Sequence, residues 1–284
     1  MIGNLQMELI LIAVLTAITC CLPGVFLILR GVAMMSDAIS HAILLGITIM
    51  FLVAQRLHSP FLIVGAVCAG VLTVMCTEMI VWSRKLKQDA AIGLIFPLFF
   101  SVGVMLISRY ARNVHLDIDM VLLGELAFAP FNRLIIAGYD CGPHALWVVG
   151  CALLLNICFI RFFYKELVLT TFDPTLAVMS GFSPVFLYYS LMILTSIVAV
   201  ATFDIVGSIM VVALMITPCA AAYLLTHRMK DMIALSIFFA SFSAIFGFFL
   251  AFWADVSIAG SIACMTGIFF MGSLCWSKAS VEHF

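Results

Sequence analysis

The stretch Gln6–Leu29, QMELILIAVLTAITCCLPGVFLIL, carries a single charged side chain, that of Glu8. A transmembrane helix needs about 20 consecutive, mainly apolar residues, so this stretch is long enough to cross a bilayer. No basic residue precedes Glu8, so the stretch lacks the positive start of a cleaved signal peptide. We therefore predict that it is a first membrane-spanning helix.

The rest of the chain has the same apolar character. Of its 284 residues, 65% are hydrophobic and 10% are charged, and the mean hydropathy is +1.28. Soluble domains are about 45–50% apolar and about 25% charged, so a soluble fold is excluded. The composition suffices for about nine spans of about 20 residues. It predicts an all-α polytopic membrane protein with about 8–9 transmembrane helices, forming one domain over residues 1–284.

Nine hydrophobic runs are candidate spans. They are Gln6–Leu29, Met34–Ala54, Pro60–Trp82, Ala90–Ser108, Ala145–Tyr164, Pro184–Phe203, Ile205–Thr226, Met232–Trp253 and Val256–Trp276. Cytoplasmic loops carry an excess of Lys and Arg. With the N-terminus outside, the richer set of loops holds Arg30, Arg84, Lys85, Lys87, Arg161, Lys165, Arg228, Lys230 and Lys278. These loops are therefore predicted to be cytoplasmic.

Charge and cysteine placement exclude other classes of function. The net charge is −1, and with no basic tail a nucleic-acid partner is not expected. The ten cysteines contain no C-x-x-C pair and lie mostly inside hydrophobic runs. We interpret them as small packing residues rather than as zinc or redox ligands.

Two polar segments are longer than a turn requires. The first, Arg109–His144, contains the modestly apolar stretch Met120–Ala129, which is too short to span and is predicted to be a re-entrant or surface helix. The second, Lys165–Ser183, reads KELVLTTFDPTLAVMSGFS and lies on the predicted cytoplasmic side.

The second segment contains signals for a short helix. Asp173 is a suitable N-cap, Pro174 suits the first helical position, and Gly181 suits a helix end. A short capped helix in a cytoplasmic loop could bind a partner, or it could simply connect two spans.

The chain contains no nucleotide-binding loop of the P-loop type. That motif needs a Gly directly before its Lys, whereas the five lysines follow Arg84, Leu86, Tyr164, Met229 and Ser277. Transport would therefore be passive, driven by an ion gradient, or driven by ATP that a separate subunit hydrolyses.

The sharpest chemical feature is Ser36-Asp37-Ala38-Ile39-Ser40-His41, near the start of the second run. Residues four apart share one helix face, so Asp37 and His41 should lie side by side. Ionisable groups inside a membrane usually face a bundle interior or a water-filled path. A carboxylate with an imidazole suits divalent Mn, Fe or Zn. The alternative is a hydrogen-bonded pair that locks two helices together.

Three segments resemble the membrane permeases of the manganese/zinc/iron ABC importer family. They are MSDAISHAILLGI at Met35–Ile47, FDPTLAVMSGFSP at Phe172–Pro184 and VGSIMVVALMITPCAAAYLL at Val206–Leu225. They keep the family's order and spacing. The resemblance implies a permease domain with the fold of vitamin-B12-type (type II) ABC importers, in a prokaryotic inner membrane.

The resemblance also implies partners and site residues. The partners are a cytoplasmic ABC ATPase, an extracytoplasmic metal-binding protein and a second permease chain, identical or paralogous. The metal-contacting residues fall on Asp37 and His41. The ATPase-coupling residues fall on Phe172, Asp173, Pro174, Leu176 and Gly181. The chain would not itself be an enzyme, and Mn, Zn or Fe would be its transported ion rather than a permanent cofactor.

Ligand counting gives a reason for a second chain. One Asp37–His41 pair supplies two ligands, while Zn takes about four and Mn about six. Two chains related by a twofold axis would supply four ligands, with water completing the shell. The alternatives are a metal-coupled secondary transporter, an intramembrane metalloenzyme and a permease for siderophores or cobalamin.

Overall fold

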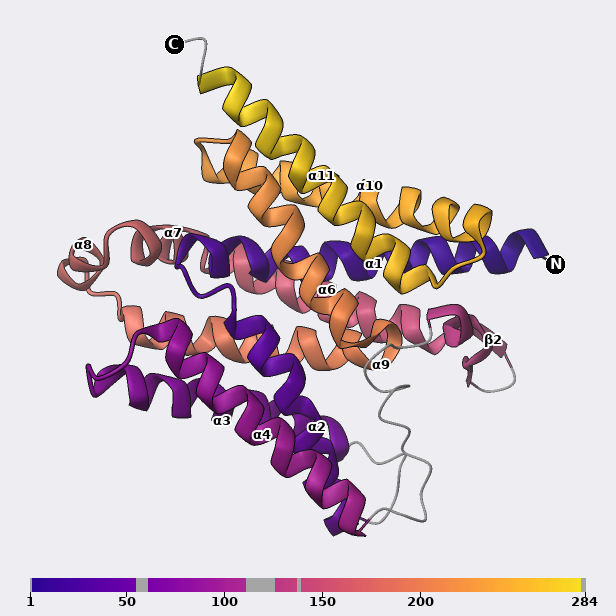
Figure 1. The fold of residues 1–284 in the computed structure, drawn as a ribbon, viewed down its shortest axis with the longest axis horizontal. Helices are drawn as coiled ribbons and strands as arrows, with labels where there is room; N and C mark the ends of the chain where they lie inside the picture. The colour runs from indigo at the N-terminus through magenta and orange to yellow at the C-terminus, as the bar shows by residue number, and fades with distance from the viewer. Residues whose placement is uncertain (1, 55–60, 111–125, 137–138, 282–284) are drawn as a thin grey trace. The chain divides into compact units, whose positions relative to one another are not determined.

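The computed structural model describes residues 2–54, 61–110, 126–136 and 139–281, and most of them are helical (Figure 1). The elements are α1 Ile2–Leu29, α2 Met35–Ala54, α3 Phe61–Trp82, α4 Gln88–Tyr110, η1 Leu126–Phe131, β1 Arg133–Ile136, β2 Tyr139–Pro143, α6 His144–Phe162, α7 Tyr164–Phe172, α8 Pro174–Met179, α9 Pro184–Leu225, α10 Met229–Ala254 and α11 Ile258–Val281. The predicted all-α class is confirmed, with one addition. The short strands β1 and β2 pair antiparallel.

Within these residues, eight helices are long and apolar enough to cross a membrane. The sequence showed nine runs because α9 joins two of them, Pro184–Phe203 and Ile205–Thr226, in one 42-residue helix. Gly207 interrupts α9 with a non-helical backbone, φ 77° and ψ 165°, which glycine adopts at little cost. The segments on either side of Gly207 are each about the length of one span.

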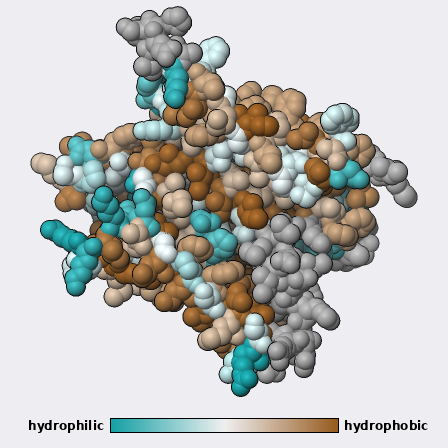
Figure 2. Space-filling view, in the orientation of Figure 1, coloured by the Kyte–Doolittle hydropathy of each residue, from teal (hydrophilic) through white to brown (hydrophobic). Residues whose placement is uncertain are grey.

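The helix surfaces are apolar, as a lipid environment requires. Figure 2 shows hydrophobic side chains along much of the visible helix surface. Large apolar side chains that are exposed in the single chain occur on most of the long helices, for example Met79 on α3, Met105 on α4 and Phe252 on α10. In water such surfaces would drive aggregation, whereas lipid tails solvate them.

The described chain falls into two compact units. The first, which we call the α2 unit, comprises residues 29–121 and 163–200. In it α2 packs along α3 and α4 (Figure 1). Small residues permit this close packing, since a Cβ on Gly46 would collide with the carbonyl oxygen of Gly65, and one on Gly103 would press on the backbone of Leu45. The bundle fixes the position of α2 and of its polar side chains.

The second unit comprises residues 1–28, 122–162 and 201–284. Here α10 packs against α11, with Gly247 directly against the backbone of Ile262. The buried side chain of Asn156 on α6 donates a 2.9 Å hydrogen bond to the carbonyl oxygen of Thr19 on α1. Such bonds between helices satisfy polar groups where no water is available.

The first polar segment of the sequence, Arg109–His144, is only partly covered by the described residues. Most of the predicted helical stretch Met120–Ala129 lies outside the described residues. Its last residues belong to η1, a 3-10 helix, and the β1–β2 pair follows. This pair was not predicted, because four- and five-residue strands leave little periodic pattern in the sequence.

Candidate metal site and short helix α8

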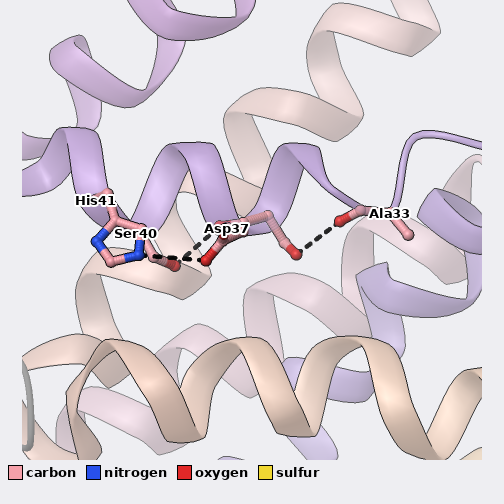
Figure 3. Close-up of polar contacts among 5 residues, drawn as sticks. Ala33, Asp37, Ser40 and His41 are labelled. Carbon is pink, nitrogen blue, oxygen red and sulfur yellow. Dashed lines mark hydrogen bonds and ion pairs between the residues drawn. The ribbon is translucent and has the colours of Figure 1, made fainter. Parts of the chain in front are cut away.

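The first two turns of α2 place the predicted site residues on one face. Asp37 lies in the first of these turns, and His41 follows one turn later. His41 Nε2 is 3.3 Å from Asp37 Oδ1, and the two side chains point toward one another along the helix surface (Figure 3). The predicted pairing of these residues on one helix face is confirmed.

The neighbouring serines do not extend this pair. Ser36 Oγ donates to the carbonyl oxygen of Ala33 at 2.8 Å, and Ser40 Oγ donates to that of Ser36 at 2.9 Å. Both hydroxyls are therefore committed to backbone carbonyl groups, that of Ser36 to the link just before α2 and that of Ser40 to α2 itself. Their bonds support the first turns of the helix that carries Asp37 and His41 (Figure 3).

Both side chains are accessible enough to meet an ion. In the single chain the side chain of His41 is 23% exposed and that of Asp37 is 32% exposed, whereas Ser36 and Ser40 are fully buried. The site is therefore partly exposed. One face of α2 is buried in the bundle, and the other face carries the carboxylate–imidazole pair.

Two aromatic rings of α4 hold the imidazole. The ring centroid of Phe96 is 5.2 Å from that of His41, and Phe100 meets the same ring edge-on at 5.6 Å. His41 Nδ1 is buried and has no hydrogen-bond partner among the described residues. Phe96 and Phe100 were not predicted, because only the packing of α2 on α4 brings them to His41.

The separation of the two polar atoms suits adjacent ligands of one metal ion. An ion bound at about 2.0–2.2 Å to each, with a ligand–metal–ligand angle of about 90–110°, holds them about 2.8–3.6 Å apart. The observed 3.3 Å lies in this range. A direct hydrogen bond also fits this distance. However, both residues belong to α2, so such a bond would not tie two helices together.

Among the residues that the structure describes, no group of three or more His, Cys, Asp and Glu side chains is placed to hold a metal ion. Asp37 and His41 therefore form a set of two protein ligands in the described part of the chain. A complete coordination shell needs donors in addition to these.

The short helix α8, which the loop charges predict to be cytoplasmic, has the predicted start. Asp173 Oδ1 accepts hydrogen bonds from the backbone N–H groups of Thr175 and Leu176, at 3.1 and 2.9 Å, and Pro174 occupies the first helical position. The predicted cap is confirmed. It satisfies backbone donors that otherwise lack a partner at a helix N-terminus.

The end of α8 is equally well defined. Gly181 has φ 83°, the N–H of Phe182 donates to Ala177 O, and that of Gly181 donates to Val178 O, both at 3.0 Å. This pair of bonds is the Schellman arrangement, which glycine favours because it adopts positive φ. The predicted helix end at Gly181 is confirmed.

Apolar side chains surround this short helix on its exposed sides. Leu176 is 48% exposed and Met179 is 85% exposed, and Phe172 and Val178 are exposed as well, whereas Ala177 is buried. We call Phe172, Leu176, Val178 and Met179 the α8 apolar surface. Capped at both ends, α8 can present this surface as a defined shape.

The Asp173 cap gives a pH-dependent prediction. Hydrogen bonds from the Thr175 hydroxyl and from the Leu176 backbone lower the pKa of Asp173 below its usual value. A lowered folded-state pKa means that the cap stabilises α8 fully above the unfolded-state pKa and is lost only as the pH falls through the folded-state pKa. At neutral pH, Asp173→Ala should therefore speed hydrogen exchange across residues 172–182 by about fivefold.

Mass-spectrometric hydrogen exchange of this segment checks the prediction. Asp173→Asn is the matched variant, because its amide oxygen still accepts the two backbone bonds. The hydrogen-exchange rate of this variant should stay close to that of the wild type. Equal exchange in the Ala variant and the wild type would contradict the capping role.

The fold and site together define a class: a polytopic helical membrane protein that carries an accessible carboxylate–imidazole pair on its second span. Residues 4–277 match the family model described as ABC 3 transport family. The chain belongs to this family. It is accordingly a multi-pass protein of the bacterial plasma membrane, and the family resemblance seen in three sequence segments is confirmed.

Individual relatives cover almost the whole chain. It is 42% identical over 267 residues to the manganese transport system membrane protein MntD of Bacillus subtilis, covering 94% of this chain and 90% of that one. It is 46% identical to the zinc transport system membrane protein TroD of Treponema pallidum, covering 94% and 72%. The solved structure of PsaBC from Streptococcus pneumoniae in complex with Fab superposes with a TM-score of 0.78 at 28% identity, covering 96% and 95%.

Proposed function

We propose that this chain is the transmembrane subunit of an ATP-driven importer of divalent transition metal ions, Mn, Zn or Fe. The observation that carries the proposal is the Asp37–His41 pair, whose 3.3 Å separation suits two adjacent ligands of one ion. The names of the relatives support the substrate class, since they are described as manganese and zinc transport proteins.

The ion itself would be the transported substrate. Carboxylate oxygen and imidazole nitrogen are acceptable donors for Mn, Fe and Zn alike. The Asp37 carboxylate offsets part of the ion's double charge, and a neutral His41 supplies a lone pair. A transport site must release its ion as well as bind it, and two protein ligands from one chain bind less firmly than a closed four-ligand site.

A second permease chain would complete the coordination shell. Two copies of the pair, related by a twofold axis, supply four protein ligands, and water fills the remaining positions of a six-coordinate ion. The partial exposure of both side chains in the single chain supports this arrangement. The second chain would be an identical copy or a paralogue.

A separate cytoplasmic ATPase would supply the energy. No lysine in this chain follows a glycine, so the chain lacks the phosphate-binding loop that such an enzyme needs. The α8 apolar surface is the proposed docking site, with Asp173, Pro174 and Gly181 fixing its shape. An extracytoplasmic binding protein would deliver the ion to the opposite side.

Reconstitution tests the proposal. The permease, its ATPase and its binding protein are placed in liposomes with ATP inside or outside, and uptake of radioactive Mn, Zn and Fe is measured. We expect ATP-dependent uptake that unlabelled Mn or Zn inhibits. Uptake by the permease alone in an ion gradient would favour a secondary transporter instead. Inhibition by chelated metal but not by free metal would favour a siderophore or cobalamin permease.

A further inference from the structure

A second polar cluster joins the link between α1 and α2 to the end of α7. Arg30 Nε donates to Thr171 Oγ1 at 3.1 Å, and Arg30 Nη2 donates to Thr170 Oγ1 at 2.9 Å. The guanidinium carbon also lies 6.0 Å from the centre of the Tyr188 ring, at the outer limit of a cation–π contact. All four residues belong to the α2 unit.

The partners that hold Arg30 in this arrangement are uncharged. Burial lowers the pKa of its guanidinium, which nevertheless stays protonated because an arginine pKa lies far above physiological pH. The nearby carboxylate of Glu78 accepts a 2.7 Å hydrogen bond from the Tyr188 hydroxyl. The described part of the chain contains two ion pairs, His41–Asp37 and Arg133–Glu8, and neither of them includes Arg30. A half-buried positive charge is thus held by hydroxyl groups and an aromatic face.

A carboxylate with one buried, unsatisfied oxygen lies one turn away along α7. Glu166 precedes Thr170 by four residues, so the two share a face of that helix. Glu166 Oε2 is buried and has no hydrogen-bond partner among the described residues. Leaving such an oxygen unpaired costs free energy. The face of α7 that meets Arg30 therefore offers two sets of acceptors: the hydroxyls now in use and a carboxylate that would bind a guanidinium more strongly.

Arg30 also stands between the two functional segments. On one side, Thr170 and Thr171 precede Asp173, which opens α8. On the other side, a short link of residues 31–34 leads from Arg30 into α2, which begins at Met35 and carries Asp37 in its first turn. The link is itself tied to the helix start, because Met35 N–H donates to Val32 O at 3.0 Å.

We propose that Arg30 couples movement of α7 and α8 to α2 by exchanging the hydroxyls of Thr170 and Thr171 for the carboxylate of Glu166. A shift of one helical turn, about 5.4 Å, replaces one set of partners by the other, and packed helices are known to switch by such one-turn steps. The inference rests on the proposed function, because it assumes that α8 binds the ATPase and that α2 carries the ion.

The test uses the reconstituted importer and measures metal ions taken up per ATP hydrolysed. Arg30→Ala should lower this ratio about fivefold or more. A fivefold effect corresponds to the lower end of typical coupling free energies between two sites. Glu166→Gln, which keeps the shape of the side chain, should also lower it. The charge-swapped pair Arg30→Glu with Glu166→Arg should recover part of the loss. Arg161→Ala, which removes an exposed arginine at the end of α6, is the matched control and should change nothing.

Two further readouts separate coupling from folding and from ion binding. Co-purification of the ATPase and Mn bound per complex should stay at wild-type levels in Arg30→Ala. An unchanged ratio, or a loss that merely follows loss of folded complex, would overturn the inference. If the wild-type complex shows no ATP-dependent uptake at all, the proposed function fails instead, so the two failures are distinguishable.

Discussion

Replacing Asp37 by asparagine is expected to abolish metal uptake while the complex stays folded. Asparagine keeps the size and the hydrogen-bonding oxygen of the side chain but removes the charge that offsets a divalent ion. Loss of a residue that only supports a metal ligand typically costs 10–100-fold, so loss of a ligand should lower uptake by about 100-fold or more. His41→Ala removes the second ligand and should have a similar effect.

The measurement is uptake per folded complex. Melting temperature without metal and co-purification of the ATPase report folding. Asp89→Asn at the exposed start of α4 and His227→Ala at an exposed position after α9 make the same chemical changes outside the site. Both controls should transport normally. Near-normal uptake by Asp37→Asn would refute the ligand role, and a large drop in melting temperature for His41→Ala would favour a structural one.

Introducing a charge on the α8 apolar surface is expected to uncouple the ATPase. The Leu176 side chain is 48% exposed in the single chain, so it is available to bind a groove of a partner. Leu176→Asp places an ionised group where the contact would be apolar and dry, and burying an unpaired charge is costly. We expect co-purification of the ATPase, or its stimulation by substrate, to fall by about tenfold or more.

The control makes the same substitution at a comparable site. Leu86 lies in the link between α3 and α4 and is 42% exposed, so Leu86→Asp introduces the same charge with similar exposure. It should leave ATPase binding unchanged. The docking assignment fails if Leu176→Asp retains full uptake and full co-purification, or if Leu86→Asp is equally damaging.

The helical spans were predictable because the bilayer imposes them. About 20 apolar residues are needed to bury a helix in lipid, and runs of that length are visible without knowledge of packing. The break inside α9 was harder to place. The sequence suggested a division next to Asp204, whereas the helix is interrupted at Gly207, because the backbone there takes a positive φ that glycine tolerates and most residues do not.

The site was predictable as far as its groups are local in sequence. Asp37 and His41 are one turn apart, and Asp173 and Gly181 mark the ends of one short helix, so spacing and capping rules are sufficient. Contacts between helices lack such a signal. Phe96 and Phe100 meet His41 only through packing of α4 on α2, and Arg30 meets Thr170 across 140 positions of sequence.

The central claim is that the ion crossing the membrane is bound directly by Asp37 and His41. Pulsed electron paramagnetic resonance of the purified complex loaded with Mn²⁺ tests it most directly, since a bound imidazole nitrogen modulates the manganese signal. We predict nitrogen modulation in the wild type and in His227→Ala, and its loss in His41→Ala under conditions where Mn²⁺ remains bound. Nitrogen modulation that persists unchanged in His41→Ala would contradict the account.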